Sequence, residues 1–592
     1  MPKYLWSELK IKNQRRYKGK GFKRKENTGI DTETYKGKCR LICDSFGEYA
    51  FINEFDDILR YLCSNRYRGK FNWFYNIKFD FEAIVKHLSQ EDLLNLYLNG
   101  HLIYNDYHIS YLDRKYFGIV DKNKNRYHFY DMFSFLDVSL NTASKTLLND
   151  NKLDIIDSSQ LNINKNYWRE NKNSIVEYCI KDAVLTAKLA NYFWDMIWNK
   201  LNYAPKRPFS KGRLSEEYFL HKFYIPTIND IPKDVLKYAY NSYSGGRFEI
   251  LQRGFFPSLY SYDIKSAYPA EIANLADYSN GEWIKGNAID YDADIGFYYC
   301  LVTCYEPLIS PFVYKYRNVL NIYPNGRFKL YLTKKEIEFI ESHFKNVEIE
   351  IISSWEFMIH HEKYPFREEI ERLYEWKETE KDKNIKLVVK IILNSLYGKT
   401  IQTVNQKTGK LFNPIWAAII TSNTRLKLLD FCYPHYDKVI AFSTDSVKST
   451  IPLKAPENPK LGEFDLDFKG RGIYIMSDIY TFWNDSKQKN KFRGFTLAVE
   501  KDYDSEEEIS LIKILEDIKY STEYTYNTKR VYHLGECLLH THKRTLNDLN
   551  LFDVVSKKIQ INGDKKRIWE RMFINGNDVR NTCIKSKPIL VI

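Results

Sequence analysis

The sequence predicts a multidomain protein that combines an α/β unit with an α+β unit. A chain of 592 residues is too long to fold around one hydrophobic core. Short β-type runs that carry a carboxylate occur in the first third of the chain and again in its second half, with helical patterns between them. From the positions of these two acidic sets we expect one unit over residues 1–205 and a second over residues 206–592.

The first acidic segment reads I-D-T-E-T, and strand alternation places its Asp31 and Glu33 on the same face. Further on, Tyr178 and Asp182 have the i, i+4 spacing that brings two side chains together on a helix. With Asp80 between these segments, four acids and a Tyr that orients water would form a two-metal hydrolytic centre. Alternating acids are common on exposed strands, so the inference depends on the ordered set.

Two further carboxylates occur in β-type runs of the second unit. Asp263 lies in Ser261–Pro269, and Asp445 lies in Val439–Val447. Such a pair suits magnesium, since hard cations take oxygen ligands and leave positions for substrate phosphates. Two metals about 3.5 to 4 Å apart can activate a 3′ hydroxyl and stabilise the leaving pyrophosphate. The implied chemistry is phosphoryl transfer, although a single Asp at a strand end is usually a turn or cap residue.

Between these runs, Lys390–Lys399 places a cation and an aromatic ring on one side of a predicted helix. Lys390, Asn394 and Tyr397 follow i, i+4, i+7 spacing and share a face, and we expect the helix to stop at Gly398. A Lys that meets a triphosphate and a Tyr that stacks under a sugar or base are typical of a nucleotide-binding helix. In isolation the same pattern also fits an amphipathic core helix whose Lys points to solvent.

In this order and spacing, the segments resemble the motifs of the family B DNA polymerases, and within them the protein-primed branch of small bacteriophages with linear genomes. The run D-I-K-S-A-Y-P resembles the first palm motif, K-I-I-L-N-S-L-Y-G the fingers motif and S-T-D-S the last palm motif. Tyr243-Ser-Gly-Gly246 resembles the YxGG linker of this branch, whose glycines let the backbone approach DNA closely. The resemblance covers nearly the whole chain.

This resemblance implies an RNase H-like 3′–5′ exonuclease domain followed by a right-hand polymerase domain. Residues 1–205 would form the exonuclease together with a basic leader, Lys10–Lys25, which we expect to be a flexible arm. The expected parts of the polymerase domain are a palm at 206–272 and 415–505, an insertion at 273–365 that docks a terminal protein, fingers at 366–414 and a thumb at 506–592.

The resemblance also implies roles for individual residues. The implied metal-binding carboxylates are Asp263 and Asp445 for synthesis and Asp31, Glu33, Asp80 and Asp182 for hydrolysis, assisted by Tyr178 and, at the scissile phosphate, by Lys152. The implied nucleotide contacts are Lys390, Asn394, Tyr397, Ile264 and Tyr268, the last lying against the sugar to exclude a 2′ hydroxyl. The implied DNA contacts are Asn76, Phe79, Ser139, Leu140, Tyr243, Gly245, Gly246, Lys491 and Arg493.

The implied cofactor is Mg2+, two ions per active site, with Mn2+ as a substitute. The implied partners are template and primer DNA, dNTPs, a terminal protein as primer and, optionally, a single-stranded DNA-binding protein. A net charge of +13 agrees with phosphate binding. Because the sequence has neither a signal peptide nor an apolar run of about 20 residues, we expect no membrane contact and a location in the cytoplasm of an infected, bacterial host.

Three departures from the family pattern bear on function. After the fingers helix, the insertion of strongly strand-displacing members is cut to a short turn, which we expect around Thr408-Gly409. Ser443 replaces an Asp two residues before Asp445, a change that should preserve activity but alter manganese dependence. Asp478 stands where the primer-contacting element has a Lys, a charge that Lys491-Phe-Arg-Gly494 could supply.

Three alternatives remain open. A DNA-primed family B polymerase would be indifferent to a terminal protein. A nuclease with a decayed polymerase half is hinted at only by Ser443, and the intact exonuclease set argues against a nonenzymatic nucleic-acid-binding protein. Nine cysteines without a CxxC pair favour neither a disulfide framework nor a zinc module.

Overall fold

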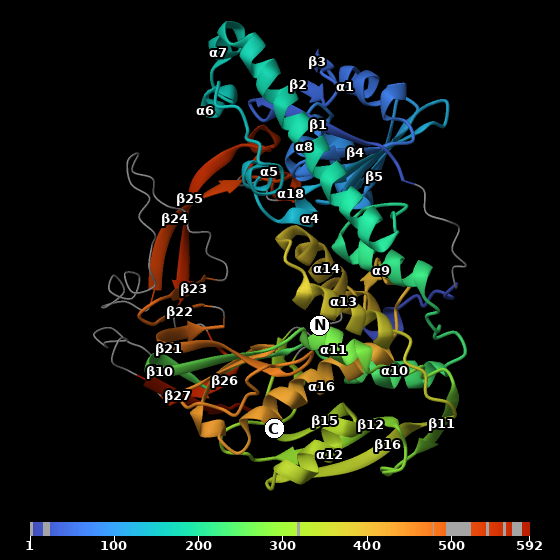
Figure 1. Cartoon of the computed structure of the whole chain (residues 1–592), viewed down its shortest axis with the longest axis vertical. Helices are drawn as coiled ribbons and strands as arrows, with labels where there is room; N and C mark the ends of the chain where they lie inside the picture. The colour runs from blue at the N-terminus through green and yellow to red at the C-terminus, as the bar shows by residue number, and fades with distance from the viewer. Residues whose placement is uncertain are drawn as a thin grey trace.

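The computed structural model describes residues 4–15, 24–316, 320–477, 479–492, 523–539, 544–560, 564–570 and 583–591. Figure 1 shows an N-terminal unit of blue and cyan elements above a larger unit that carries the remaining sheets. Parallel and antiparallel strands are mixed in the first unit, and the palm sheet of the second is antiparallel. The predicted multidomain α/β and α+β fold class is confirmed.

The N-terminal unit is a mixed sheet with the strand order β3-β2-β1-β4-β8-β7-β6-β5. Its strands are β1 (Asn27–Tyr35), β2 (Lys38–Asp44), β3 (Tyr49–Phe51), β4 (Phe71–Phe74), β5 (His101–Tyr104), β6 (Tyr107–Leu112), β7 (Tyr116–Val120) and β8 (Arg126–Asp131). Its helices are α1 (Phe55–Leu62), α2 (Ile77–Val85), α3 (Gln90–Asn99), α4 (Phe133–Leu136), α5 (Leu140–Leu148), α6 (Ser158–Leu161), α7 (Lys165–Glu170) and α8 (Lys172–Leu201).

The long helix α8 packs directly on β1, as the diagonal helix in Figure 1 shows. Gly29 permits this approach, because a Cβ there would lie 1.9 Å from the carbonyl oxygen of Ala183. The central strand and the helix that carry the predicted acids are therefore in direct contact.

The second unit contains the palm sheet, whose strand order is β23-β22-β21-β10-β20-β19-β9, with β27 pairing to β10 and to β26. Its strands are β9 (Arg247–Ile250), β10 (Gln252–Ile264), β19 (Val439–Thr444), β20 (Ser446–Ser449), β21 (Phe464–Met476), β22 (Ile479–Trp483), β23 (Gln488–Phe492), β26 (Arg567–Trp569) and β27 (Cys583–Pro588). The helices around it are α9 (Lys211–Lys222), α10 (Lys233–Ser242), α11 (Ala267–Ala273), α13 (Arg367–Thr379), α14 (Lys383–Ser395), α15 (Tyr397–Thr400) and α16 (Pro414–Cys432).

A separate sheet with the order β11-β16-β12-β15-β28 occupies most of the segment 273–365. Its strands are β11 (Gly281–Gly286), β12 (Ile295–Cys304), β15 (Asn325–Thr333), β16 (Val347–Ile359) and β28 (Leu590–Val591), with α12 (Lys334–His343) against them and a small hairpin of β13 (Tyr314–Tyr316) and β14 (Leu320–Ile322) beside them. The C-terminal strand β28 runs parallel to β15, so the end of the chain closes this sheet.

The largest hydrophobic core cluster spans both units. It runs from Trp194 on α8 through Leu214 on α9 and Val389 on α14 to Trp416 on α16. Trp416 is also anchored by its indole N–H, which donates to the carbonyl oxygen of Ala276 at 3.0 Å. Helices from the N-terminal unit and from the second unit therefore share one apolar interior.

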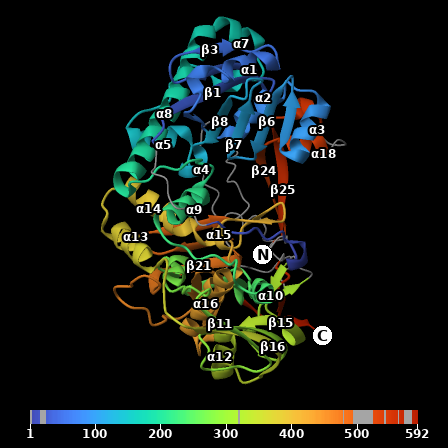
Figure 2. The same ribbon diagram turned by 90° about the vertical axis from the view of Figure 1, so that its right-hand side faces the viewer.

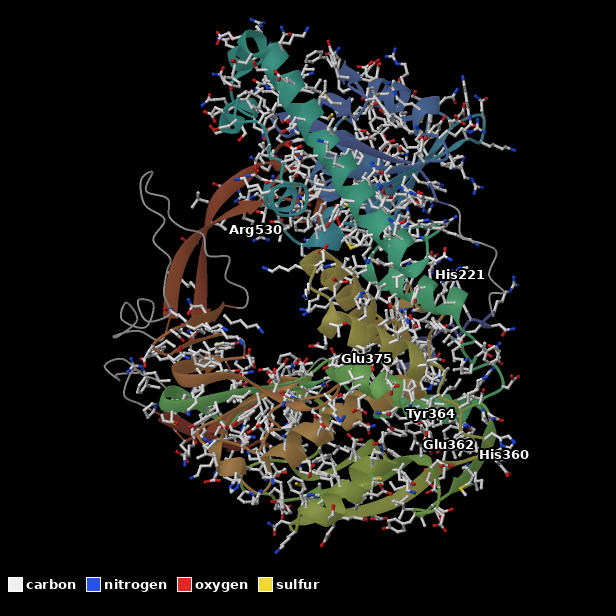
Figure 3. The ribbon with its side chains drawn as sticks, in the orientation of Figure 1. His221, His360, Glu362, Tyr364, Glu375 and Arg530 are labelled. Atoms are coloured by element: carbon white, nitrogen blue, oxygen red, sulfur yellow. The ribbon has the colours of Figure 1, made fainter. Side chains whose placement is uncertain are left out.

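The hairpin of β24 (Glu523–Val531) and β25 (Phe552–Gln560) extends from the palm side to the N-terminal unit, on the left of Figure 1. Its tip contains α18 (Leu534–Leu539), which is tied to the end of β24 by an ion pair between Arg530, labelled in Figure 3, and Glu536. The later strands β26, β27 and β28 join other sheets. The segment 506–592, predicted as one thumb, is thus divided between this hairpin and the sheets of the second unit.

Residues 4–15 of the N-terminal segment are packed against the second unit. The rings of Trp6 and Tyr240 lie 5.6 Å apart, and the Tyr240 hydroxyl donates to the carbonyl oxygen of Tyr4 at 2.7 Å. The backbone N–H of Lys10 donates to Gln406 at 2.8 Å. The prediction of a flexible arm from Lys10 is therefore wrong up to residue 15, while residues 16–23 lie outside the described part of the chain.

A two-residue hairpin follows the fingers, as predicted, but its turn is displaced. Strands β17 (Thr403–Val404) and β18 (Lys407–Thr408) pair across Asn405 and Gln406, whose φ angles are 48° and 63°. The turn predicted at Thr408-Gly409 is therefore wrong, since the left-handed backbone lies earlier. The predicted helix stop at Gly398 is also wrong, because Gly398 lies inside α15 and the break comes at Leu396.

Among the described residues, no helix combines the length and the apolar character that a membrane crossing requires.

Candidate active sites

The N-terminal unit brings its four predicted carboxylates to one place. Asp31 and Glu33 come from β1, Asp80 from α2 and Asp182 from α8. The Thr32 hydroxyl, between the two β1 acids, donates to Asp80 Oδ1 at 2.6 Å. Burial and the negative charges of Asp182, Glu33 and Asp80 raise the pKa of Asp31 well above its usual value, a coupling that requires all four groups to be close.

The same crowding affects the other acids of this cluster. Burial, followed by the charge of Asp182, raises the pKa of Glu33 to about 8. Burial raises the pKa of Asp80 to about 7, against the opposing hydrogen bond from Thr32. These four acids repel one another when they are ionised at the same time. A cation that binds between them relieves this repulsion and lowers the free energy of the site. The cluster therefore has the electrostatics of a metal site.

The donor atoms also fit a hard divalent cation. Asp182 Oδ2 pairs with Lys152 Nζ at 2.5 Å, whereas Asp182 Oδ1 is buried and has no hydrogen-bond partner among the described residues. Ligand atoms of Asp31, Glu33 and Cys179 lie within 4.8 Å of one another. Burial raises the pKa of the Cys179 thiol, and hard cations prefer carboxylate oxygens to sulfur. The remaining oxygen donors match Mg2+ or Mn2+.

Lys152, which was predicted to act at the scissile phosphate, contacts both Asp182 and Tyr178. Its ammonium lies 4.8 Å from the centre of the Tyr178 ring. Burial lowers the pKa of Lys152, but the charge of Asp182 and its hydrogen bond outweigh burial, so that the pKa is raised overall. Lys152 therefore stays charged beside the carboxylates, where a phosphate could contact it.

The predicted contacts to the primer end lie at helix starts around this cluster. Asn76 adopts a left-handed conformation with φ 68° at the start of α2, and its side chain is exposed. Phe79 is half-buried on the next turn. Ser139 caps α5 by accepting a hydrogen bond from the Thr142 N–H at 3.1 Å, and Leu140 is buried behind it.

Asp131, a buried carboxylate that the sequence motifs did not identify, positions Asn76. Asp131 Oδ1 accepts hydrogen bonds from the backbone N–H groups of Asn76 at 2.9 Å and Ile77 at 3.1 Å. Burial raises the pKa of Asp131 to about 6 although these bonds oppose the shift. Its position as the last residue of β8 was the available signal, because strand ends meet the next helix start at one edge of a sheet.

The palm sheet brings Asp263 and Asp445 together. Asp263, near the end of β10, is paired in register with Ser446, the first residue of β20. Asp445 is the residue between β19 and β20, after Thr444 at φ 61°. The backbone N–H of Ile264 donates to the carbonyl oxygen of Asp445 at 2.9 Å. Burial and the charge of Asp445 raise the pKa of Asp263 to about 7.

Three lysines surround this pair. Lys448 on β20 and Lys489 on β23 oppose the rise in the pKa of Asp263, and Lys448 and Lys491 oppose the rise for Asp445. Lys491 is paired in register with Tyr480 across β22 and β23. The sequence indicated Lys491 but not Lys448 or Lys489. Asp478 and Arg493, both predicted to bear on this region, lie outside the described residues.

Ser443 is buried in β19, two residues before Asp445. Its hydroxyl lies 3.4 Å from that of Tyr474 on β21, so it faces the neighbouring palm strand. Ile264, predicted as a nucleotide contact, has a buried side chain in the core under the palm. Its observed part in the site is the backbone bond to Asp445.

Three predicted tyrosines and the glycine linker meet above the palm carboxylates. The ring centres of Tyr268 on α11 and Tyr397 on α15 lie 4.3 Å apart. The hydroxyls of Tyr243 and Tyr397 lie 2.8 Å apart. A Cβ at Gly246 would lie 2.9 Å from the Thr444 side chain and 3.1 Å from the Tyr268 hydroxyl. Residues of the three sequence motifs and the linker therefore lie in direct contact.

Arg425, which the sequence motifs did not identify, holds the linker in place. Its Nη1 donates to the carbonyl oxygens of Ser244 at 2.8 Å and Gly245 at 3.0 Å. Its Nη2 donates to Glu336 of α12 at 2.7 Å, which neutralises this buried cation. Because its partners are backbone atoms and an acid of the insertion, no local pattern could reveal this role.

Lys390 and Asn394 are exposed on α14, on the side that continues to Tyr397. Neighbouring apolar residues of the helix, among them Val389 and Ile392, are buried in the shared core. The helix thus packs through one side and presents the predicted polar face outward. A charged ligand could meet this face without displacing core side chains.

Comparison with known proteins gives one matching family, described as DNA polymerase type B, organellar and viral, over residues 62–413. This range is more than half of the chain. It includes Asp80, Asp182, Asp263 and Lys390, but ends before Asp445. The DNA polymerase of Acidianus bottle-shaped virus (isolate Italy/Pozzuoli) is 26% identical over 287 residues, which cover 43% of this chain and 40% of that protein.

Solved structures of similar fold include the Phi29 DNA polymerase in an orthorhombic crystal form, with a TM-score of 0.62 and 16% identity over 91% of this chain and 100% of the other. The Phi29 DNA polymerase with primer-template DNA and incoming nucleotides gives the same TM-score of 0.62, and the complex with single-stranded DNA gives 0.61, both at 16% identity and with the same coverage. At this identity the similarity establishes the fold.

Proposed function

Because the chain belongs to the organellar and viral type B DNA polymerases, we propose that it is a DNA-directed DNA polymerase with a 3′–5′ proofreading exonuclease, which replicates a linear viral genome from a terminal protein primer. The observation that supports the synthetic activity is the proximity of Asp263 and Asp445 to each other and to Tyr268, whose ring contacts Tyr397. Carboxylates for metal and aromatic surface for a nucleotide are thereby adjacent.

In this proposal Asp263 and Asp445 hold the metal ions of synthesis, with Mg2+ as the expected ion and Mn2+ as a substitute. Bound there, two divalent ions would supply the Lewis acidity that phosphoryl transfer from a dNTP requires. Lys390, exposed on α14, neutralises the triphosphate, and Tyr397 lies beneath the incoming base. Tyr268, held against Tyr397, stands at the sugar and excludes a 2′ hydroxyl.

The second activity is assigned to the acids of the N-terminal unit. Asp31, Glu33, Asp80 and Asp182 form a buried, mutually repelling group that suits two divalent ions. Lys152 contacts the scissile phosphate from the side of Asp182. A mispaired primer end would be guided to these acids by Asn76, Phe79, Ser139 and Leu140.

Protein priming is supported by the sheet β11-β16-β12-β15-β28, which stands in the place where the resembled branch docks its terminal protein. Template, primer and dNTPs are the further proposed partners, with a single-stranded DNA-binding protein as an optional one. A structure of similar fold, the Phi29 DNA polymerase, holds primer-template DNA and incoming nucleotides.

The proposal is tested by extension of a labelled primer on a single-stranded DNA circle with Mg2+ and all four dNTPs. We expect products up to one lap of the circle and their loss in Asp445→Ala. Products longer than one lap would show strand displacement despite the short β17–β18 hairpin. Shortening of the primer without extension would instead favour a nuclease with a decayed polymerase half.

The exonuclease is tested on the same primer without dNTPs. Asp31→Ala combined with Glu33→Ala should preserve a full-length primer, and continued degradation would refute the assignment.

Protein priming is tested by adding the candidate terminal protein from the same genome with a labelled dNTP. Formation of a protein–nucleotide adduct supports it, whereas efficient DNA priming without any adduct favours the DNA-primed alternative.

A further inference from the structure

A basic groove lies between the N-terminal unit and the fingers, apart from the two acidic sites. Its volume is about 690 Å³. Among the described residues that line it, eight are Lys or Arg and one is a carboxylate. That carboxylate, Glu216, is already engaged by Arg213 at 3.0 Å and by Lys399 at 3.4 Å. The groove is therefore strongly electropositive and suits a polyanion.

The groove is assembled from segments that are distant in the sequence. Residues 4–15, which we call the strap, contribute Lys12 and Arg15. The N-terminal unit contributes Lys115 from the turn before β7, and the connection to α9 contributes Arg207. The hairpin β17–β18, which lies beside the strap, contributes Lys407. Figure 2 shows the dark-blue strap beside α15, below the sheet of the N-terminal unit.

The strap is fixed by strand-like pairing to the hairpin. Lys10 N–H donates to Gln406 at 2.8 Å, and the Thr408 N–H donates to Lys10 at 3.3 Å. The Lys12 N–H donates to the Thr408 hydroxyl at 3.0 Å. Gln14 then bonds to Phe412 through its side-chain amide at 2.6 Å. A strand added to a hairpin edge in this way satisfies backbone groups on both sides and holds the basic residues at the groove.

The groove adjoins the helix that carries Tyr397. Lys399, which lines the groove, belongs to the same short helix α15 as Tyr397, whose ring centre lies 4.3 Å from that of Tyr268. Gly212 allows α9 to approach here, since a Cβ would lie 2.8 Å from Lys399 Cε. A strand that passes Tyr397 on this side of α15 would thus meet the groove next. The strand that is unpaired ahead of the incoming nucleotide is the template.

We propose that the strap and the β17–β18 hairpin enclose the unpaired template strand ahead of the polymerase site and hold its phosphates through Lys12, Arg15, Lys115, Arg207 and Lys407. The inference rests on the proposed polymerase function. Phosphate contacts of this kind hold a strand without reading its sequence.

The test measures equilibrium binding of fluorescent primer-template DNA, without dNTPs, as a function of salt. One template has a 5′ overhang of two nucleotides and the other an overhang of twenty. Wild-type protein should bind the long overhang more tightly and with a steeper salt dependence, because each phosphate contact to a single strand adds about 0.7 to the slope of log K against log salt.

The variant Lys12→Gln with Lys407→Gln removes two exposed charges from the groove. It should lower the slope for the long overhang by about 1.4 and leave binding of the short overhang unchanged. The matched control, Lys122→Gln with Lys165→Gln, removes two exposed charges outside the groove and should behave as wild type. Equal effects of the two variants, or no benefit of the long overhang in the wild type, would overturn the proposal.

A second variant tests the strap itself. Lys10→Pro removes the N–H that bonds Gln406, so hydrogen exchange at Thr408 should accelerate and the preference for the long overhang should fall. Accelerated exchange with an unchanged preference would show that the strap is structural only. Extension of the short-overhang substrate by each variant reports the polymerase separately. If no protein extends it while the overhang preference persists, the polymerase proposal fails and the binding groove remains.

Discussion

Lys152 reaches the four acids of the N-terminal unit from a segment outside β1, α2 and α8, and its contacts are specific. It pairs with Asp182 at 2.5 Å and lies over the ring of Tyr178. Its loss removes a positive charge from the site without opening the core. We expect Lys152→Ala to slow primer degradation by about 100-fold, the scale seen when one charge-stabilising donor is removed, and to leave primer extension intact.

The measurement is single-turnover degradation of a labelled single strand. Lys145→Ala is the control, because Lys145 is exposed on the neighbouring helix α5. A similar loss in the control, or a parallel loss of extension, would show that the effect is not specific to the scissile phosphate.

Tyr268 offers a second prediction at this scale, because it is held between Tyr397 and Gly246. Tyr268→Val would open space at the position where, in the proposed function, a 2′ hydroxyl is excluded. The preference for dNTPs over rNTPs, measured as a ratio of kcat/KM values, should fall by about 10- to 200-fold, the range for one group in a pocket. The exposed Tyr305→Val is the control. Unchanged discrimination would refute the placement of Tyr268 at the sugar.

Residues with a local pattern could be predicted, and residues that act through distant partners could not. The alternation of Asp31 and Glu33 and the helical spacing of Tyr178 and Asp182 follow from the geometry of one element. Arg425, in contrast, acts on the carbonyl oxygens of Ser244 and Gly245, 181 and 180 residues away. Such roles depend on the packed structure, and the composition around them carries no signal.

At the scale of elements, the tip of the β24–β25 hairpin is joined to the N-terminal unit by buried polar contacts. Glu82 on α2 accepts hydrogen bonds from His533 Nδ1 at 2.8 Å and from the Leu534 N–H at 3.0 Å. Lys86 Nζ donates to the carbonyl oxygens of Asn547 at 2.8 Å and Leu549 at 2.5 Å. The thumb hairpin is therefore anchored at its far end.

Glu82→Ala should release this anchor, because it leaves the Leu534 N–H without a partner at a cost of about 1–3 kcal/mol. We expect hydrogen exchange across residues 532–539 to accelerate while exchange in β1 is unchanged. Glu91→Ala on the exposed face of α3 is the matched control. Unaltered protection of residues 532–539 in Glu82→Ala would show that apolar packing alone holds the tip.

Strands and helices with strong periodicity were predictable, whereas their ends and their partners were less so. The alternating run Val347–Ile352 forms the start of β16, as its period of two indicates. The turn after β17 lies at Asn405-Gln406, where both residues adopt positive φ, and not at Thr408-Gly409, where it was predicted. The strap was missed because its pairing depends on an edge that forms about 400 residues later.

At the scale of the whole molecule, the two acidic sites link stability to pH and to metal. In the folded protein the pKa is about 8 for Glu33 and about 7 for Asp80 and Asp263, above ordinary values of 4.5 for Glu and 3.8 for Asp. The folded state therefore binds protons that the unfolded state releases between about pH 4 and pH 8. Its free energy of unfolding should fall as pH rises through this window when metal is chelated.

We expect the melting temperature in EDTA to be lower at pH 8 than at pH 5, and Mg2+ or Mn2+ to raise it at pH 8 through binding to the folded state. Glu33→Gln should raise the melting temperature in EDTA at pH 8 and weaken the response to metal. Differential scanning calorimetry checks both. A melting temperature that rises with pH in EDTA would contradict the charge crowding seen in the structure.

The order of motifs was enough to predict the class of the whole molecule, because each acidic set requires a sheet to carry it. Contacts between parts of the chain that are far apart in the sequence could not be predicted. The anchor from Glu82 to His533 spans 451 residues, and the strand β28 joins a sheet whose other members end at residue 359. Contacts of such separation leave no trace in local periodicity.

The pairing of Lys12 with Thr408 also orders events during biosynthesis. The strap precedes its partner by 396 residues, which at about 5–20 residues per second corresponds to about 20–80 s of translation. During this time the β17–β18 hairpin has not yet been synthesised, so the strap has no partner with which to pair. A polypeptide that ends before residue 408 would lack the contact between the strap and the β17–β18 hairpin. Such an unfinished chain could not hold a template in the proposed groove.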